Sequence, residues 1–131
     1  MADKKVLVVD DEIHIVYVVA IKLRNNGYEV ISAENGADAF KLACEEKPDI
    51  IVTDFQMPVM TGLELVKKLR GNEATKDIPV IMLTARDFAI EEEQKQDLQI
   101  SEVLNKPFSP KEVLSSVQDI LYQQALMQEN R

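Results

Sequence analysis

Four short hydrophobic runs in this sequence each stop at a reactive polar residue. Runs 6–9, 50–53, 80–83 and 103–105 are followed directly by Asp10, Asp54, Thr84 and Lys106, respectively. Short runs rich in Val and Ile and bounded by turn residues are typical of strands buried on both faces. Segments of helical length separate the runs, so the pattern predicts parallel strands joined by right-handed βαβ crossovers.

Over its full length the pattern predicts five β–α units. Strands are expected at 5–9, 29–33, 49–53, 79–83 and 102–105, and helices at about 12–26, 36–46, 61–71, 90–97 and 110–128. Gly27 ends the first helix, and Ser109 and Pro110 begin the last one as N-cap and first helical residue. The predicted fold is a doubly wound α/β domain, with helices on both faces of a five-stranded parallel sheet. No repeat or linker interrupts residues 1–131, which are expected to form one domain.

The polar residues at the strand ends are expected to form one site. In a parallel sheet the carboxyl ends of the strands lie at one edge, where open α/β sheets bind ligands. The side chains that meet there are those of Asp10, Asp11, Asp54, Thr84 and Lys106. Three carboxylates, a hydroxyl and an ammonium indicate a site for a hard cation and a phosphoryl group.

Each of these residue types suits one part of a phosphoryl transfer. Asp54 ends the middle strand and carries the only plausible nucleophile of the set. Asp10 and Asp11 supply oxygen ligands for Mg²⁺, which screens the repulsion among the carboxylates. Lys106 is expected to pair with Asp54 and then with the transferred group, while Thr84 donates a hydrogen bond to a phosphoryl oxygen. The expected product is an aspartyl phosphate.

Each residue also has a purely structural explanation. Asp11 or Glu12 could cap the first helix, and the Thr84 hydroxyl could bond its own backbone. Lys106 could be an ordinary solvated lysine. Four motifs in order, each at a predicted strand end, favour the functional explanation for the set. His14 is different: a lone helical histidine is most often exposed, so we assign it no role.

The four motifs together resemble those of a known family. They are residues 8–12 (VVDDE), 54–62 (DFQMPVMTG), 83–85 (LTA) and 106–108 (KPF). On these residues the chain resembles a response-regulator receiver domain, similar to chemotaxis regulators, which is the phosphoacceptor module of bacterial two-component signalling. The resemblance covers nearly the whole chain and implies a flavodoxin-like (βα)5 fold with strand order 2-1-3-4-5.

The resemblance also implies partners and further roles. Asp54 would take a phosphoryl group from a phosphohistidine of a histidine kinase or a histidine phosphotransfer protein. The backbone carbonyl of Gln56 would complete the Mg²⁺ site of Asp10, Asp11 and Asp54. The domain would then change its partner-binding surface, and would catalyse only its own phosphotransfer and autodephosphorylation. A monomer or a phosphorylation-dependent dimer is expected, with an output partner that the sequence does not identify.

Composition narrows the classes of function. Lys and Arg number 15 against 23 Asp and Glu, a formal charge of −8, which argues against a nucleic-acid-binding surface in this chain. The single Cys44 cannot form an internal disulfide, which fits a reducing cytosol, and its apolar helical setting predicts a packed thiol. No signal peptide is visible, and the apolar stretch 15–21 is too short to span a bilayer, so a cytoplasmic location is expected.

Three other functions fit the sequence less well. A flavodoxin-like cofactor binder would need a hydroxyl- and glycine-rich first loop, whereas residues 10–12 would repel the flavin phosphate. Phosphohydrolases with an aspartate nucleophile carry a second Asp two residues later, and here that residue is Gln56. A degenerate receiver that only binds partners is disfavoured by the intact Asp, Thr and Lys set. Whether the chain is a complete regulator or part of a longer one stays open.

Two features depart from the family pattern. The position three residues before Lys106, usually Tyr or Phe in the family, is Val103, and residues 98–102 lack the usual Gly-Ala pair. Phosphoacceptance is expected to survive, but the readout would have to use the loop after Thr84 or another surface. Residues 13–23 carry two apolar stripes where an amphipathic helix needs one. Burial is the commoner explanation and is expected here, with an exposed docking patch as the alternative.

Overall fold

One parallel sheet organises the molecule. The computed structural model describes residues 4–85 and 90–129. Its strands are β1 (Lys5–Val9), β2 (Glu29–Ala33), β3 (Ile50–Asp54), β4 (Val80–Thr84) and β5 (Ile100–Asn105). They pair in parallel in the order β2-β1-β3-β4-β5, which confirms the predicted topology. The carboxyl ends of all five strands therefore lie at one edge.

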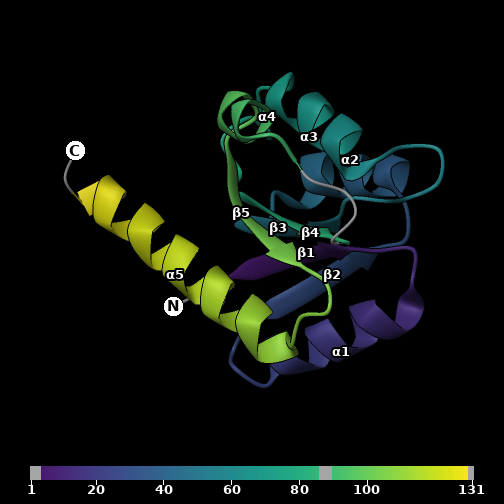
Figure 1. Cartoon of the computed structure of the whole chain (residues 1–131). Coiled ribbons are helices and arrows are strands. Elements are labelled where there is room, and N and C mark those ends of the chain that lie inside the picture. Colours follow the sequence, from purple (N-terminus) through teal and green to yellow (C-terminus); the bar gives the residue numbers. More distant parts are fainter. Residues whose placement is uncertain (1–3, 86–89, 130–131) are drawn as a thin grey trace.

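Helices cover both faces of this sheet (Figure 1). They are α1 (Ile13–Arg24), α2 (Gly36–Glu46), α3 (Gly62–Arg70), α4 (Glu92–Asp97) and α5 (Pro110–Glu129). Helices α1 and α5 pack on one face, and α2 and α3 pack on the other. Helix α4 is short, polar and without a buried residue. Within the described part of the chain, no helix combines the length and apolar character needed to cross a bilayer.

Alternation along the strands divides the core into two layers. In β1, Val6 and Val8 face the α1–α5 layer, whereas Leu7 and Val9 face the α2–α3 layer. All four side chains are fully buried, because a central parallel strand is covered on both faces. This explains why the strands read as continuous hydrophobic runs, and it fixes the polar residues that follow them at the sheet edge.

Local signals set the starts of the helices. Thr61 and Glu64 form a reciprocal capping box at α3, with the Glu64 N–H 3.2 Å from the Thr61 hydroxyl. Ser109 and Glu112 form the same arrangement at α5, which confirms Ser109 as the N-cap. Gly27, after α1, has φ +91°, a conformation that glycine adopts without a steric cost.

The observed bounds differ from the predicted ones by one or two residues. Strands β3 and β4 each extend through the polar residue that was expected to follow them, because Asp54 pairs with Leu83 and Thr84 pairs with Asn105. Strand β5 begins at Ile100, two residues earlier than expected. Helix α4 begins at Glu92 rather than at residue 90, and residues 86–89 lie outside the described part.

Helix α1 corrects one expectation. Its second apolar stripe is exposed rather than buried: Ile13 is 64% and Tyr17 66% exposed, and Val18 and Ile21 are also exposed. Only Val19, Ala20 and Leu23 are fully covered. The sheet and α5 cover one side of α1, and hydrophobicity alone cannot reveal which side that is. The expectation of burial is therefore wrong for this stripe, and a docking role for the exposed patch stays a prediction.

Candidate functional site

The site is built from the carboxyl ends of four strands. Asp10 follows β1 directly, Asp54 and Thr84 are the last residues of β3 and β4, and Lys106 follows β5. A pocket of about 580 Å³ opens at this edge. It is lined by Asp11, Glu12, Asp54, Gln56, Met57, Pro58, Ala85 and Lys106. The fold thus brings residues from distant parts of the sequence to one crevice.

Three carboxylates lie close together in this crevice. One oxygen each from Asp10, Asp11 and Asp54 falls within 4.8 Å of the others. Asp10 is 0% and Asp54 4% exposed, whereas Asp11 is exposed to solvent. Two buried carboxylates and one at the surface make an oxygen-rich cluster that opens to one side, which suits a hard cation that keeps some of its waters.

Asp10 is incompletely satisfied. Its Oδ1 accepts a hydrogen bond from the Glu12 N–H at 2.9 Å, but Oδ2 is buried without a hydrogen-bond partner among the described residues. The nearest cation is Lys106, whose Nζ lies 3.9 Å away. Burial, reinforced by the charge of Asp54, raises the pKa of Asp10 to about 6. An orphaned carboxylate oxygen inside an acidic cluster fits a bound cation, because such groups are otherwise costly.

Asp54 and Lys106 form the central ion pair. Lys106 Nζ lies 3.1 Å from Asp54 Oδ1. Burial raises the pKa of Asp54 above its ordinary value, although Lys106 opposes the change. For Lys106, burial lowers the pKa, but the hydrogen bond to Asp54 and the neighbouring carboxylates outweigh it and raise the pKa overall. At neutral pH the lysine is therefore a fixed positive charge beside the Asp54 carboxylate.

Thr84 and the loop after Asp54 form the other walls. The Thr84 hydroxyl donates to the Ala85 carbonyl at 3.1 Å, a local bond to the backbone of the next residue rather than to its own. Gln56 is exposed at the pocket, and Met57 is buried beneath it. Val59, in the same loop, is fully exposed with φ +71°. That conformation is unusual for a β-branched residue.

The capping explanation for the acidic cluster does not hold. Glu12 is the N-cap of α1 but makes no side-chain cap hydrogen bond. Its carboxylate instead lies 3.3 Å from His14 Nε2, and both side chains are largely exposed. Asp11 is likewise exposed. The Asp11 and Glu12 carboxylates therefore do not cap α1, and they remain available at the mouth of the pocket.

Two residues near the site have structural roles that the sequence did not reveal. A Cβ on Gly62 would lie 2.5 Å from the Asp54 carbonyl oxygen and 2.7 Å from Met82 Sδ, so only glycine allows α3 to start this close to the Asp54 backbone. Glu12 supplies the N–H that binds Asp10. The motif contained both residues, but only the close packing in three dimensions reveals what they do.

The fold and site define the class of protein. Residues 6–118 match the family model described as the response regulator receiver domain. The chain belongs to this family, in which phosphorylation on Asp is characteristic and whose members act as phosphoacceptors in two-component systems.

Particular relatives agree with this assignment. The chain is 37% identical over 121 residues to the phosphate regulon transcriptional regulatory protein PhoB of Pseudomonas aeruginosa, covering 92% of this chain and 53% of that protein. It is 42% identical over 119 residues to the alkaline phosphatase synthesis transcriptional regulatory protein PhoP of Bacillus subtilis, covering 91% and 49%. The chain thus spans about half the length of these relatives.

Solved structures give the same result. The chemotaxis response regulator CheY4 of Vibrio cholerae superposes with a TM-score of 0.83 at 36% identity, covering 91% of this chain and 99% of that one. A response regulator from Chloroflexus aurantiacus superposes with a TM-score of 0.84 at 30% identity, covering 92% and 99%. These comparisons confirm the predicted family and fold. The roles predicted for individual site residues stay predictions.

Proposed function

We propose that this receiver domain, taken as residues 1–131, accepts a phosphoryl group on Asp54 from a phosphohistidine and thereby changes its partner-binding surface. One observation carries the proposal: a buried Asp54 carboxylate contacts Lys106 at 3.1 Å and shares its crevice with Asp10 and Asp11. A nucleophilic carboxylate needs a charged environment to approach a phosphoryl group that is already negative. This arrangement supplies that environment.

The proposed transfer conserves bonds and charge. An Asp54 carboxylate oxygen attacks phosphorus opposite the imidazole nitrogen of the donor, and the P–N bond breaks as the new P–O bond forms. The bonding electron pair returns to the imidazole, which leaves as neutral histidine because its other ring nitrogen carries a proton. The product is an acyl phosphate on Asp54. No proton has to leave the nucleophile when it reacts as the carboxylate, the charged form that the Lys106 ammonium favours.

Lys106 and Thr84 are proposed to hold the transferred group. The Lys106 ammonium can exchange its contact with Asp54 for a phosphoryl oxygen, because both are anionic and lie on the same side of the pocket. The Thr84 hydroxyl donates to Ala85 before transfer and would turn to a phosphoryl oxygen afterwards. That rotation releases the Ala85 carbonyl, so the loop after β4 becomes the first backbone to respond.

The donor set also suits Mg²⁺. We propose that Asp10, Asp11, Asp54 and the backbone carbonyl of Gln56 would hold the ion, consistent with the orphaned Asp10 Oδ2. When bound, it would neutralise part of the negative charge on the carboxylates and the phosphoryl oxygens. Asp10 and Asp11 thereby serve as ligands rather than nucleophiles, which leaves Asp54 as the single acceptor.

The proposed partner is a histidine kinase or a histidine phosphotransfer protein, in the cytoplasm. The exposed apolar face of α1 adjoins a largely apolar pocket that Lys106 also lines. Such a surface beside the acceptor can dock a helix that carries the donor histidine. The net charge of −8 supports proposing that this chain does not itself bind nucleic acid. With Gln56 in place of a second Asp, turnover on external substrates is not proposed.

Intact-mass measurement tests the proposal. After incubation with Mg²⁺ and a small phosphodonor, the wild-type protein should gain one phosphoryl group, and Asp54→Ala should gain none. Chelating the metal should abolish labelling. Equal labelling of the two proteins would contradict the assignment of Asp54.

A further inference from the structure

The loop between β3 and α3 carries a tight, strained turn beside the crevice. The Met60 N–H donates to the Pro58 carbonyl at 2.7 Å, and Val59 between them has φ +71°. A hydrogen bond that spans three residues, with a positive φ at the central one, defines the rare and strained form of the γ-turn. A β-branched residue is unusual at its centre, because the side chain crowds the backbone at positive φ.

The rest of the loop is held in place, so the strain at the turn persists. Met57 is buried in the α2–α3 layer. Met60 lies against the start of α2, where a Cβ on Gly36 would come within 2.7 Å of Met60 Sδ. The Gly62 N–H donates to Phe55 O at 2.8 Å and closes the loop at the start of α3. These contacts fix the backbone on both sides of the turn.

The Val59 side chain does not stabilise the fold. It is fully exposed, so no apolar packing offsets the strain of its backbone. Glycine adopts a positive φ without a steric cost, and a glycine at this position would make the folded domain more stable. Strained backbone that the surroundings impose is concentrated at functional sites. The side chain therefore acts outward, on a molecule that approaches this loop.

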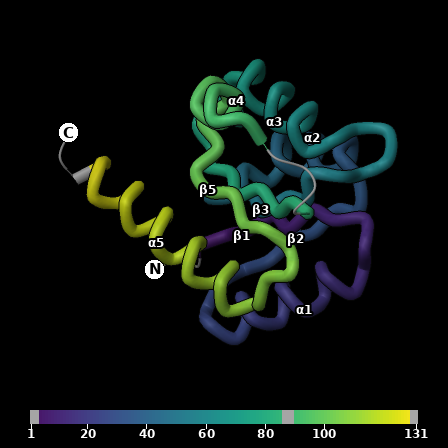
Figure 2. Tube along the Cα trace, in the orientation of Figure 1, coloured from purple at the N-terminus to yellow at the C-terminus, as the bar shows by residue number. Residues whose placement is uncertain are grey.

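This loop forms one rim of the crevice that contains Asp54. The three residues before Val59 line the pocket there, whereas Val59 itself does not. Figure 2 shows the loop leaving the sheet at the same edge as the turn between β1 and α1. A small phosphodonor can enter the pocket without touching the Val59 side chain. A folded protein that presents a phosphohistidine has to cover the rim, and it meets this side chain as it does so.

We propose, on the basis of the function proposed above, that Val59 is a specificity-determining residue for the protein donor. Its isopropyl group enters an apolar recess on the partner that carries the phosphohistidine. The contact needs little ordering, because the valine side chain is short and the turn beneath it is already rigid. A donor with a charged group at this point is disfavoured, since the charge would lose its water against a methyl group.

Transfer kinetics from two donors, both with Mg²⁺ present, test the proposal. One donor is phosphoramidate, and the other is an autophosphorylated histidine kinase that phosphorylates the wild-type chain, chosen from a purified panel. Val59→Thr keeps the shape and the β-branch but replaces a methyl group by a hydroxyl, and Val59→Gly removes both the side chain and the strain. Both variants should lower kcat/KM with the kinase by about fivefold to tenfold, mainly through KM. Phosphorylation by phosphoramidate should be unchanged.

Two control variants separate this contact from other effects. Val59→Ile extends the apolar group and should keep most of the kinase-dependent rate. Tyr122→Gln changes an exposed apolar residue of α5, in the half of the helix that extends away from the sheet (Figure 1). This variant should match the wild type with both donors.

Two results with the kinase would overturn the proposal. Equal kinetics for the wild type, Val59→Thr and Val59→Gly mean that the donor does not use this side chain. Slow transfer to Val59→Gly but normal transfer to Val59→Thr assigns the effect to the strained backbone rather than to an apolar contact. A wild-type chain that neither donor phosphorylates contradicts the proposed function itself, and the specificity of Val59 with it, so the two failures are distinguishable.

Discussion

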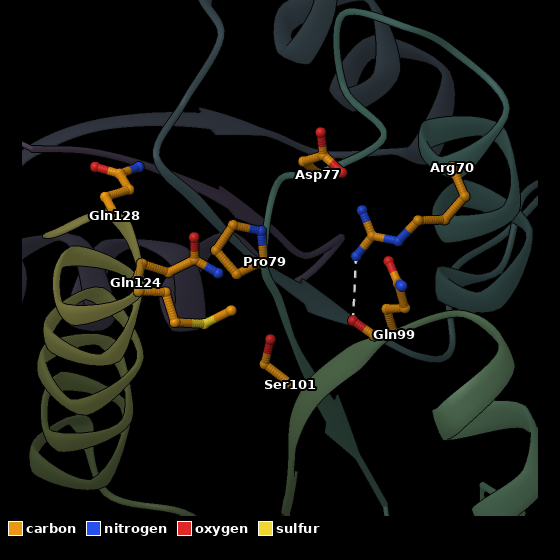
Figure 3. A pocket seen from close by; sticks show the side chains of 8 residues that line it. Arg70, Asp77, Pro79, Gln99, Ser101, Gln124 and Gln128 are labelled. Atoms are coloured by element: carbon orange, nitrogen blue, oxygen red, sulfur yellow. Dashed lines mark hydrogen bonds between the residues drawn. The ribbon is translucent and has the colours of Figure 1, made fainter. Parts of the chain in front are cut away.

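The two edges of the central sheet differ in how they pair charged groups that are fully or partly buried. At the carboxyl edge, Asp10 and Asp54 are buried with a single lysine between them, and Asp10 Oδ2 has no hydrogen-bond partner among the described residues. At the amino edge the comparison is with Arg70, a half-buried residue at the end of α3 (Figure 3). Each edge has a pocket beside it, but the polar groups within the two pockets differ in how fully they are paired.

Arg70 is satisfied by backbone carbonyls from two loops. Its Nε donates to Leu98 O at 2.8 Å, and Nη2 donates to Gln99 O at 3.2 Å. Nη1 donates to Lys76 O at 2.9 Å and to Ile78 O at 2.8 Å. The planar fork of the guanidinium thus joins the end of α3 to the connections before β4 and before β5.

How fully a polar group is paired helps to distinguish a structural role from a ligand-binding role. A buried polar group whose hydrogen bonds are all internal stabilises the fold and leaves nothing for a ligand. Buried carboxylates that repel each other and lack partners destabilise the fold, and persist where a ligand completes them. By this criterion we propose that the amino edge is structural and that the carboxyl edge is the ligand site.

The largest expected effect is on stability at the amino edge. Arg70→Ala should lower the free energy of unfolding by about 2–4 kcal/mol, because it leaves several carbonyls without their donor. Arg70→Lys should recover only part of this, since an ammonium cannot span both loops. Urea unfolding measures the loss. Both variants should still accept a phosphoryl group on Asp54 under folding conditions. Loss of this phosphorylation in folded Arg70→Lys would contradict a purely structural role for the amino edge.

The opposite result is expected for Asp10→Asn. The pKa of Asp10 is raised in the folded state, so its contribution to stability is present at low pH and is lost as pH rises through about 6. Without metal, Asp10→Asn should match the wild type near pH 4 and exceed it by about 2 kcal/mol near pH 8. Unfolding free energies across this range give the comparison. If the wild type were the more stable of the two at pH 8, the claim that the ionised Asp10 carboxylate destabilises the fold would be contradicted.

A third comparison separates packing from signalling next to the site. Val103 is half-buried against the α2–α3 layer, so Val103→Ala should cost about 1–2 kcal/mol in stability. Its effect on the phosphorylation-dependent change should be small, whereas Thr84→Ala should weaken that change strongly. Hydrogen exchange of β4 and β5, with and without a phosphoryl mimic, measures the phosphorylation-dependent change in each variant. The reverse ranking would make residue 103 the switch.

The smallest effect concerns strained backbone near each edge. Val59 in the site loop and Gln99 beside Arg70 both have positive φ, +71° and +54°. Val59→Gly should raise stability by about 1 kcal/mol, because a β-branched side chain is disfavoured there. Gln99→Gly should change stability less, since its unbranched side chain crowds the backbone less. Thermal unfolding of the two variants ranks them, and a larger gain at Gln99 would contradict the steric argument.

Sequence reasoning succeeded where local chemistry determines structure. Hydrophobic runs fixed the strands, and the parallel topology then placed Asp10, Asp54 and Lys106 at one edge. The role of Arg70 could not be predicted, because its partners are backbone carbonyls up to 29 residues away and such contacts leave no motif. The exposure of Tyr17 was also missed, since an apolar stripe looks the same whether or not another element covers it.

The most direct test is the response of stability to Mg²⁺. The unfolding free energy at neutral pH should be measured with and without Mg²⁺ for the wild type, Asp10→Asn and Arg70→Lys. Binding to the folded state alone raises stability, so Mg²⁺ should stabilise the wild type and Arg70→Lys by the same amount and Asp10→Asn by little. Equal stabilisation of all three proteins, or none in the wild type, would contradict the claim that the incompletely paired carboxylates are the cation site.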